Sequence, residues 1–179
     1  RDIWWPDLVR ASRLYDVKYS GYFIHTYNDI ITPPFDIDNK YIDDIIKDYG
    51  IELIKTGGEL GLHGYNHQPL DITGNNTKFF GYKAWDNENN ILSAVDYSLE
   101  FIKKTFPEYK IKSYVPPSNI ITEAGRNALK KSMKDLLVIS SVFDAAETDP
   151  TYVQEFEISP DGIVEFPRLT AGYTQNSDM

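Results

Sequence analysis

The sequence contains no cysteine among its 179 residues. Disulfide scaffolds and cysteine-ligated zinc sites are therefore both excluded. Basic residues are also scarce, because 18 lysines and arginines stand against 27 aspartates and glutamates, which leaves a formal charge of −9. A nucleic-acid binder needs clustered cations that displace phosphate counterions, and the sequence has no such cluster. The charge is compatible with a neutral or cationic partner.

Long apolar runs are missing as well. No stretch approaches the roughly 20 apolar residues of a membrane-spanning helix, and no signal peptide is visible. The chain begins with Arg1 rather than Met, and residues 2–5 read as sequence from inside a domain. We therefore expect further residues upstream of Arg1.

What the sequence does contain is an ordinary amount of core material. Hydrophobic residues make up 41% of the chain and aromatic residues 14%, which indicates a packed domain rather than disorder. A chain of this length fits one domain, over residues 1–179. The 13 tyrosines and three tryptophans supply flat amphipathic surface that suits sugar faces, although most of them are expected in the core.

Helical and strand patterns alternate along the chain. Helices are predicted over residues 6–15, 39–49, 89–106 and 122–133, and strands over residues 19–25, 59–63, 111–115, 136–140 and 164–166. Residues 51–54 fit either a continuation of the second helix or a short strand. Alternation with right-handed crossovers predicts a parallel sheet or a (β/α) barrel. In such folds the site lies at the carboxyl ends of the strands.

The most informative feature is a pair of histidines, His63 and His67, at the end of the second predicted strand. Two histidines at this spacing bind a metal when they lie on one helix face, but Gly64 and Pro69 disfavour a helix here. No glutamate follows His63, so the helical motif of zinc proteases is absent. Gly64 permits a tight turn that could bring both rings together. The alternative is a hydrogen-bonded histidine at a strand end and an unrelated surface histidine.

The residues around this pair resemble a known family. The stretch Gly58–His67 is similar to the second motif of the NodB-like polysaccharide deacetylases, carbohydrate esterase family 4, in which an acidic residue and a Gly precede His, a Ser or Thr, and a second His. Residues 14–23 resemble the family's helix and aromatic strand, residues 112–119 its third motif, and residues 137–144 more weakly its fourth, with Asp144 as the acidic loop residue or a plain loop carboxylate.

Two positions depart from the family pattern. Gly64 stands where a Ser or Thr hydroxyl is expected, and Val115 stands where an Arg normally precedes the Pro pair. Arg168, which follows a later strand, is the candidate catalytic residue that would replace this arginine. The alternative for Arg168 is a surface salt bridge.

The resemblance implies a fold and a site. It implies a distorted (β/α) barrel of the polysaccharide deacetylase type, an α/β fold incomplete at both ends of this chain. The family's Asp-Asp pair would precede Arg1 and its late histidine acid would follow Met179. His63 and His67 would bind a divalent metal, with zinc as the expected ion. The substrate-binding residues would be Tyr65, Pro116, Pro117, Ser118 and Asn119, lining a sugar cleft. An aromatic segment, Phe79, Phe80, Tyr82 and Trp85, could stack on a glycan or pack against the barrel.

The implied function is metal-dependent hydrolysis of N-acetyl or O-acetyl groups on a polysaccharide. This polysaccharide would belong to the cell envelope or be a secreted exopolysaccharide. The partner would be the acetylated polysaccharide or oligosaccharide, and the protein would be extracellular or in the cell envelope. Two alternatives stay open. One is a non-catalytic glycan-binding module on the same scaffold, and the other is a (β/α) metal hydrolase acting on a different substrate, such as a cyclic amide.

Overall fold

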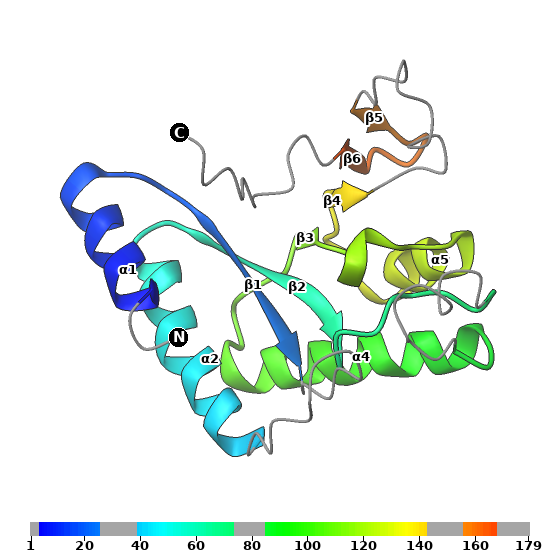
Figure 1. Ribbon diagram of the computed structural model, residues 1–179, viewed down its shortest axis with the longest axis horizontal. Coiled ribbons are helices and arrows are strands. Elements are labelled where there is room, and N and C mark those ends of the chain that lie inside the picture. Colours follow the sequence, from blue (N-terminus) through cyan, green and yellow to red (C-terminus); the bar gives the residue numbers. More distant parts are fainter. Residues whose placement is uncertain (1–3, 26–38, 74–84, 143–155, 168–179) are drawn as a thin grey trace, which may run out of the picture.

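The computed structural model describes residues 4–25, 39–73, 85–142 and 156–167, which form one sheet with helices packed against it (Figure 1). The strands are β1 (Ser20–His25), β2 (Glu59–Tyr65), β3 (Ser113–Tyr114), β4 (Val138–Val142), β5 (Glu157–Ile158) and β6 (Val164–Pro167). The helices are α1 (Trp4–Tyr15), α2 (Asn39–Lys55), α4 (Glu88–Thr105) and α5 (Glu123–Ser132), with a 3₁₀ turn η1 at Pro117–Asn119.

The strand order is β1-β2-β3-β4-β6-β5. All neighbours are parallel except β5 and β6, which are antiparallel. The described strands therefore form an open sheet whose parallel members end on the same side. The described segments that follow β2 and β3 therefore lie at that side, which is where α/β folds place their ligands.

Helices α2 and α4 pack against β2, and α5 packs against α4 (Figure 1). Helix α4 shows why this packing forms: its buried residues recur at helical spacing, at Ile91, Ala94, Val95, Ser98 and Ile102. Asn87 begins the helix, because its side chain accepts a hydrogen bond from the Asn90 N–H at 3.0 Å. The predicted helix over residues 89–106 is thus confirmed within one residue at each end.

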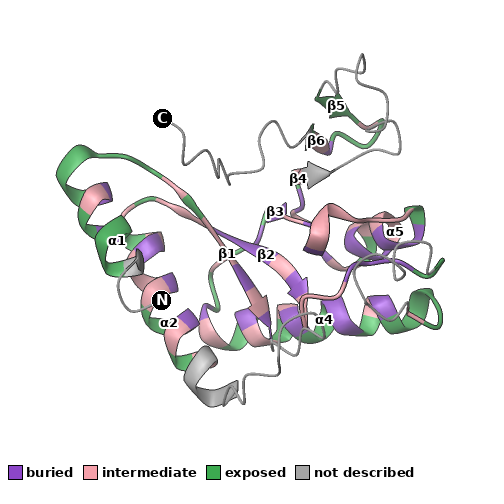
Figure 2. Ribbon diagram, viewed as in Figure 1, coloured by how far each residue is buried: buried purple, intermediate pink, exposed green. Residues whose placement is uncertain are grey.

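Strand β2 lies at the centre of the core, as its buried colouring shows (Figure 2). Leu60 and Leu62 are almost fully buried. Near the start of β2 the hydroxyl of Tyr109 forms hydrogen bonds with both backbone groups of Leu60, as a neighbouring strand would. It accepts from the Leu60 N–H at 2.8 Å and donates to the Leu60 carbonyl at 3.1 Å. This pairing satisfies backbone groups that would otherwise be buried without partners.

The structure decides between two alternatives for one segment and differs from the sequence-based expectations in three details. Residues 51–54 continue α2, which is one of the two alternatives. Strand β2 extends to Tyr65, so His63 lies inside the strand and not at its end. The third strand is two residues long, at 113–114, and not five. The short strand β5 was not expected; among the described strands it pairs with β6, across a turn at residues 159–162.

Candidate functional site

His63 is positioned by two strands. It lies on β2, and its Nδ1 is 2.7 Å from the main-chain oxygen of Val115, the residue that follows β3. The Val115 N–H in turn donates to the Leu62 carbonyl at 3.0 Å, which fixes Val115 beside β2. Because a carbonyl only accepts hydrogen bonds, Nδ1 must carry the proton, and Nε2 is left with a lone pair. This is the arrangement by which proteins orient a histidine for a metal ion.

His67 is positioned by a tight turn. Gly64, Asn66 and His67 have positive φ values of 82°, 56° and 50°. The Asn66 N–H donates to the carbonyl of His25 at 2.8 Å, and the Gln68 N–H donates to that of Tyr65 at 3.0 Å. The turn brings the His67 ring back to His63, with ring centroids 5.0 Å apart and ring planes at 73°.

This separation fits a shared ion. With Zn–N bonds of about 2.0–2.1 Å and a tetrahedral angle, two imidazole centroids would lie roughly 5 Å apart. Burial lowers the pKa of His63 below its ordinary value, the Val115 carbonyl opposes that shift, and the proximity of His67 adds to it. The ring is therefore neutral at neutral pH, as a metal ligand must be. Within the part of the chain that the structure describes, no three or more His, Cys, Asp or Glu side chains gather in one possible metal site.

The Pro-Pro segment borders this turn. The side chains of Pro116 and Pro117 are among the most deeply buried in the protein, whereas Ser118 and Asn119 are partly exposed. The two prolines are thus buried in this structure, and their contact with a substrate stays a prediction. Ser118 and Asn119 have positive φ values of 51° and 62°.

Backbone strain is concentrated around the histidines. Among the described residues, five that are not glycine have positive φ, and four of these are Asn66, His67, Ser118 and Asn119. Such conformations cost of the order of 1–3 kcal/mol each for a poorly suited residue and collect at functional sites. The two loops are thus held in shapes that local preferences alone would not choose.

The third histidine lies beneath the same turn. His25 ends β1 and is 5% exposed, and its ring stacks with those of Tyr97 and Phe101, at centroid distances of 4.9 Å and 4.8 Å. Its Nδ1 is buried without a hydrogen-bond partner among the described residues, and burial lowers the pKa of His25. Sequence reasoning did not select His25, because a single histidine in an apolar strand has no distinguishing pattern.

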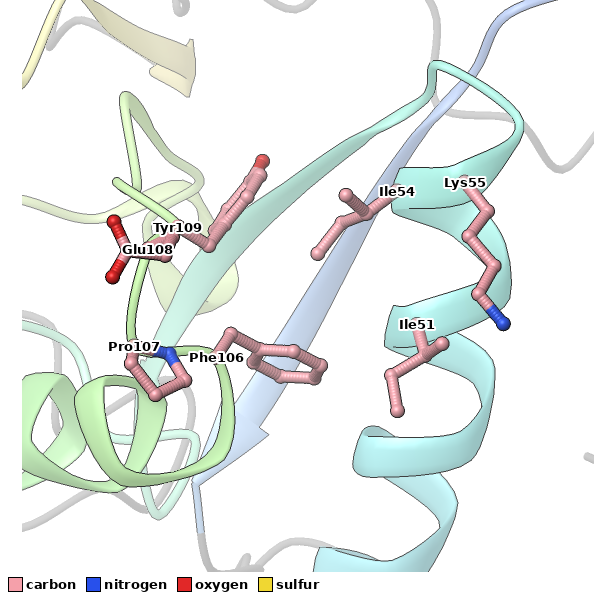
Figure 3. A pocket seen from close by; sticks show the side chains of 7 residues that line it. All are labelled: Ile51, Ile54, Lys55, Phe106, Pro107, Glu108 and Tyr109. Atoms are coloured by element: carbon pink, nitrogen blue, oxygen red, sulfur yellow. The ribbon is translucent and has the colours of Figure 1, made fainter.

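A cavity of about 330 Å³ lies away from the histidines, at the opposite ends of the strands, between α2 and the turn after α4 (Figure 3). It is lined by Ile51, Ile54, Lys55, Phe106, Pro107, Glu108 and Tyr109. Its walls are mainly apolar, and Lys55 and Glu108 do not point toward a common centre (Figure 3). The cavity therefore lacks the convergent polar groups of a catalytic site.

Several predicted residues lie outside the described part of the chain: Arg168, Asp144, Phe79, Phe80 and Tyr82. The catalytic role of Arg168 accordingly stays a prediction. Sequence reasoning missed the role of Val115, whose main-chain carbonyl accepts the hydrogen bond from His63 Nδ1. No side-chain pattern could have revealed it, because the hydrogen bond is made by a backbone carbonyl.

Solved structures share this fold. One is BA3943 from Bacillus anthracis, a carbohydrate esterase family 4 (CE4) pseudoenzyme, with a TM-score of 0.52 at 12% identity over 75% of this chain and 37% of that one. A mutant of that pseudoenzyme with restored enzymatic activity matches with the same TM-score and identity, over 38% of its chain. A Mycobacterium smegmatis protein designated a polysaccharide deacetylase matches with a TM-score of 0.55 at 15% identity, over 92% of this chain and 45% of that one.

These likenesses confirm the predicted fold: the chain has the α/β scaffold of the NodB-like polysaccharide deacetylases. It spans less than half the length of each of these structures. The chain belongs to DUF2194, a family described as uncharacterised proteins conserved in bacteria, whose model matches residues 1–179. No curated protein sequence matches it. None of the helices in the described ranges has both the length and the apolarity of a membrane span.

Proposed function

We propose that this chain contributes the metal-binding histidines of a polysaccharide deacetylase, an enzyme that hydrolyses N-acetyl or O-acetyl groups on a cell-envelope or secreted glycan. The observation that carries the proposal is the hydrogen bond from His63 Nδ1 to the Val115 carbonyl, together with the 5.0 Å separation of the His63 and His67 rings. A histidine that served only the core would have no need of a second imidazole at the distance that a shared ion requires.

The residues of this chain have distinct tasks in the proposal. His63 and His67 bind a divalent cation, with zinc as the expected ion, through neutral rings. When bound, such an ion lowers the pKa of a coordinated water and polarises an acetyl carbonyl. Val115 fixes the proton of His63 on Nδ1. Ser118 and Asn119 stay partly exposed beside the turn and can contact a sugar. Arg168 remains the candidate for orienting a catalytic carboxylate, in place of the arginine that Val115 replaces.

A second candidate function is glycan binding without catalysis. Two observations favour it. Val115 stands at the position of the family's arginine, and the scaffold is similar to that of a CE4 pseudoenzyme. The two candidates share the histidine pair and the glycan, and they differ only in whether acetate is released.

Metal binding is tested first, by titrating the purified protein with zinc in a calorimeter. His63→Ala and His67→Ala should each weaken binding by more than about 100-fold, because each removes a ligand. His25→Phe is the matched control, since it removes the remaining histidine of the chain without touching the pair, and it should bind zinc as the wild type does. Full zinc occupancy in the His63→Ala/His67→Ala double variant would refute the metal site.

Activity is tested next, by measuring acetate released from an N-acetylated oligosaccharide with and without a chelator. Release that is abolished by the chelator and restored by zinc supports the deacetylase. Tight oligosaccharide binding without release would support the binding module. Hydrolysis of a small cyclic amide, with no action on the oligosaccharide, would contradict both and point to another class of metal hydrolase.

A further inference from the structure

A second cavity adjoins the histidine turn, on the side of β2 that faces the beginning of α4. Its volume is about 380 Å³, within the range of roughly 300–1,000 Å³ that is typical of small-molecule sites. It is lined by Tyr65, Trp85, Asn90, Ser93, Ala94 and Tyr97. Tyr65 lies between His63 and His67 in the chain, two residues from each, so the cavity lining includes the middle residue of the segment that links the two histidines.

One face of α4 forms the other wall. Asn90, Ser93, Ala94 and Tyr97 follow the i, i+3, i+4, i+7 spacing and so lie along one side of the helix. Asn90, Ser93 and Tyr97 are exposed, so this face presents an amide, a hydroxyl and an aromatic ring beside the buried Ala94. The small side chain of Ala94 leaves the space between them open.

The aromatic rings of the cavity are fixed before any ligand arrives. The Trp85 indole N–H donates to the Pro69 carbonyl at 3.0 Å, and the Trp85 main-chain N–H donates to that of Asp71 at 3.0 Å. Tyr97 stacks on His25 at 4.9 Å and 21°, and it meets Tyr65 edge-on at 5.8 Å. Tyr97 is nevertheless 55% exposed. Rigid amphipathic rings of this kind provide contact area at little cost in conformational entropy.

The polar groups suit a neutral, hydroxyl-rich ligand. The Ser93 hydroxyl donates to the Asn89 carbonyl at 2.9 Å, so its oxygen still has lone pairs to accept a ligand hydroxyl. Asn90 offers both a donor and an acceptor from its exposed carboxamide. The described residues that line the cavity include no charged side chain. An uncharged sugar ring, with apolar C–H faces and peripheral hydroxyls, matches this combination of aromatic walls and neutral polar groups.

We propose that this cavity is a subsite for a neutral sugar residue of the glycan, next to the residue whose acetyl group is presented to His63 and His67. That the glycan is acetylated is taken from the proposed function, on which this inference rests. It adds that recognition extends along the chain of sugars onto α4. A short acetylated oligosaccharide should therefore bind more tightly than the monosaccharide.

The test is the affinity of zinc-loaded protein for tetra-N-acetyl-chitotetraose, measured by calorimetry, with zinc affinity measured in parallel. Tyr97→Ala should weaken oligosaccharide binding at least tenfold, because it removes the exposed ring, and should leave zinc affinity unchanged. Tyr97→Phe, which keeps the ring and its stacking on His25, should stay within about threefold of the wild type. Binding of N-acetylglucosamine itself should change little between the three proteins.

The outcomes separate this subsite from the proposed function. Unchanged oligosaccharide affinity in Tyr97→Ala, or no binding by zinc-loaded wild type at millimolar oligosaccharide, would overturn the subsite while leaving the metal site intact. If the wild type binds the oligosaccharide but no zinc, and the Tyr97→Ala variant binds the oligosaccharide more weakly, the subsite is upheld and the metal-dependent enzyme is refuted.

Discussion

Gly64 and Pro117 are packed so closely that a Cβ atom on residue 64 would lie 2.7 Å from Cγ of the proline. Gly64 also has a φ of +82°, a conformation that side-chain-bearing residues rarely adopt. Both facts give a physical reason for glycine at a position where the deacetylase motif has Ser or Thr. The turn that brings His67 to His63 leaves no room for the hydroxyl residue.

Gly64→Ser should therefore destabilise the protein. The positive φ contributes about 1–2 kcal/mol, and the contact with Pro117 adds about 1–3 kcal/mol of overpacking. Gly162→Ser is the matched control, because Gly162 has the same φ of +82° and a Cβ atom there would have no neighbour within 4 Å. Urea unfolding should show the larger loss for Gly64→Ser, and Pro117→Ala should recover part of it. Equal losses at the two glycines would contradict the role of Pro117.

His25→Phe should stabilise the protein and weaken its dependence on pH. The buried Nδ1 has no partner among the described residues, so replacing the ring by an apolar one removes an uncompensated polar atom beside Tyr97 and Phe101, worth about 1 kcal/mol or more. Because burial lowers the pKa of His25, the unfolded chain binds the proton more tightly than the folded one. Stability is thus highest above the ordinary histidine pKa and falls as pH drops through that value toward the folded pKa.

The measurement is the free energy of unfolding between pH 5 and 8. Among the described residues, the rings that contact His25 are those of Tyr65, Tyr97 and Phe101, and none of them is a charged side chain. The difference in stability between His25→Phe and the wild type should grow as the pH falls. A constant difference across the range would show that His25 titrates alike in the folded and unfolded chains.

Tyr109→Phe should cost about 1–3 kcal/mol, because the backbone N–H and carbonyl of Leu60 would lose their shared partner inside the core. Tyr15→Phe provides the comparison, since Tyr15 is 74% exposed and its hydroxyl can be replaced by water. Thermal unfolding of the two variants should separate them clearly. Similar stability for both would mean that water reaches Leu60 when the hydroxyl is removed.

Glu165→Ala should cost more than Asp135→Ala. Glu165 accepts two hydrogen bonds from Arg126, at 2.8 Å and 2.9 Å, and both side chains are less than a quarter exposed. Removing Glu165 leaves the guanidinium without this partner in a half-buried position, at a cost of about 2–3 kcal/mol. The Lys110–Asp135 pair is solvent-exposed, so Asp135→Ala should cost less than about 1 kcal/mol. Chemical denaturation at low and high salt would detect the difference.

The helices were the most predictable part of the fold. Helix α4 has a long amphipathic pattern, a capping asparagine and a proline after its end, and these signals agree. Residues 51–54 were ambiguous, because a short apolar run fits a buried helix turn and a strand equally well. Packing decides between them: Leu53 is fully buried as part of α2. Strand β5 escaped prediction because two residues carry no periodicity, although Asp161-Gly162 was an available turn signal.

The histidine pair was predictable as a motif but not as a geometry. Spacing and family resemblance selected His63 and His67, whereas their convergence depends on left-handed φ values at Asn66 and His67 itself. Asparagine tolerates that conformation well, but a histidine in it cannot be read from sequence. The polar face of α4 was missed for a related reason. Asn90, Ser93 and Tyr97 read as an ordinary solvated helix surface until β2 is seen beside them.

The different supports of the two histidines have a consequence for how an ion would leave. His63 is anchored in the sheet and by the Val115 carbonyl, so it is released only when β2 and β3 separate. His67 is held by a surface turn, and such turns open far more often than the core. On warming, we expect the His67 side to detach while the sheet remains intact. The time for which a shared cation stays bound would then depend on how often the turn opens. It would not depend on the free energy of unfolding of the whole domain.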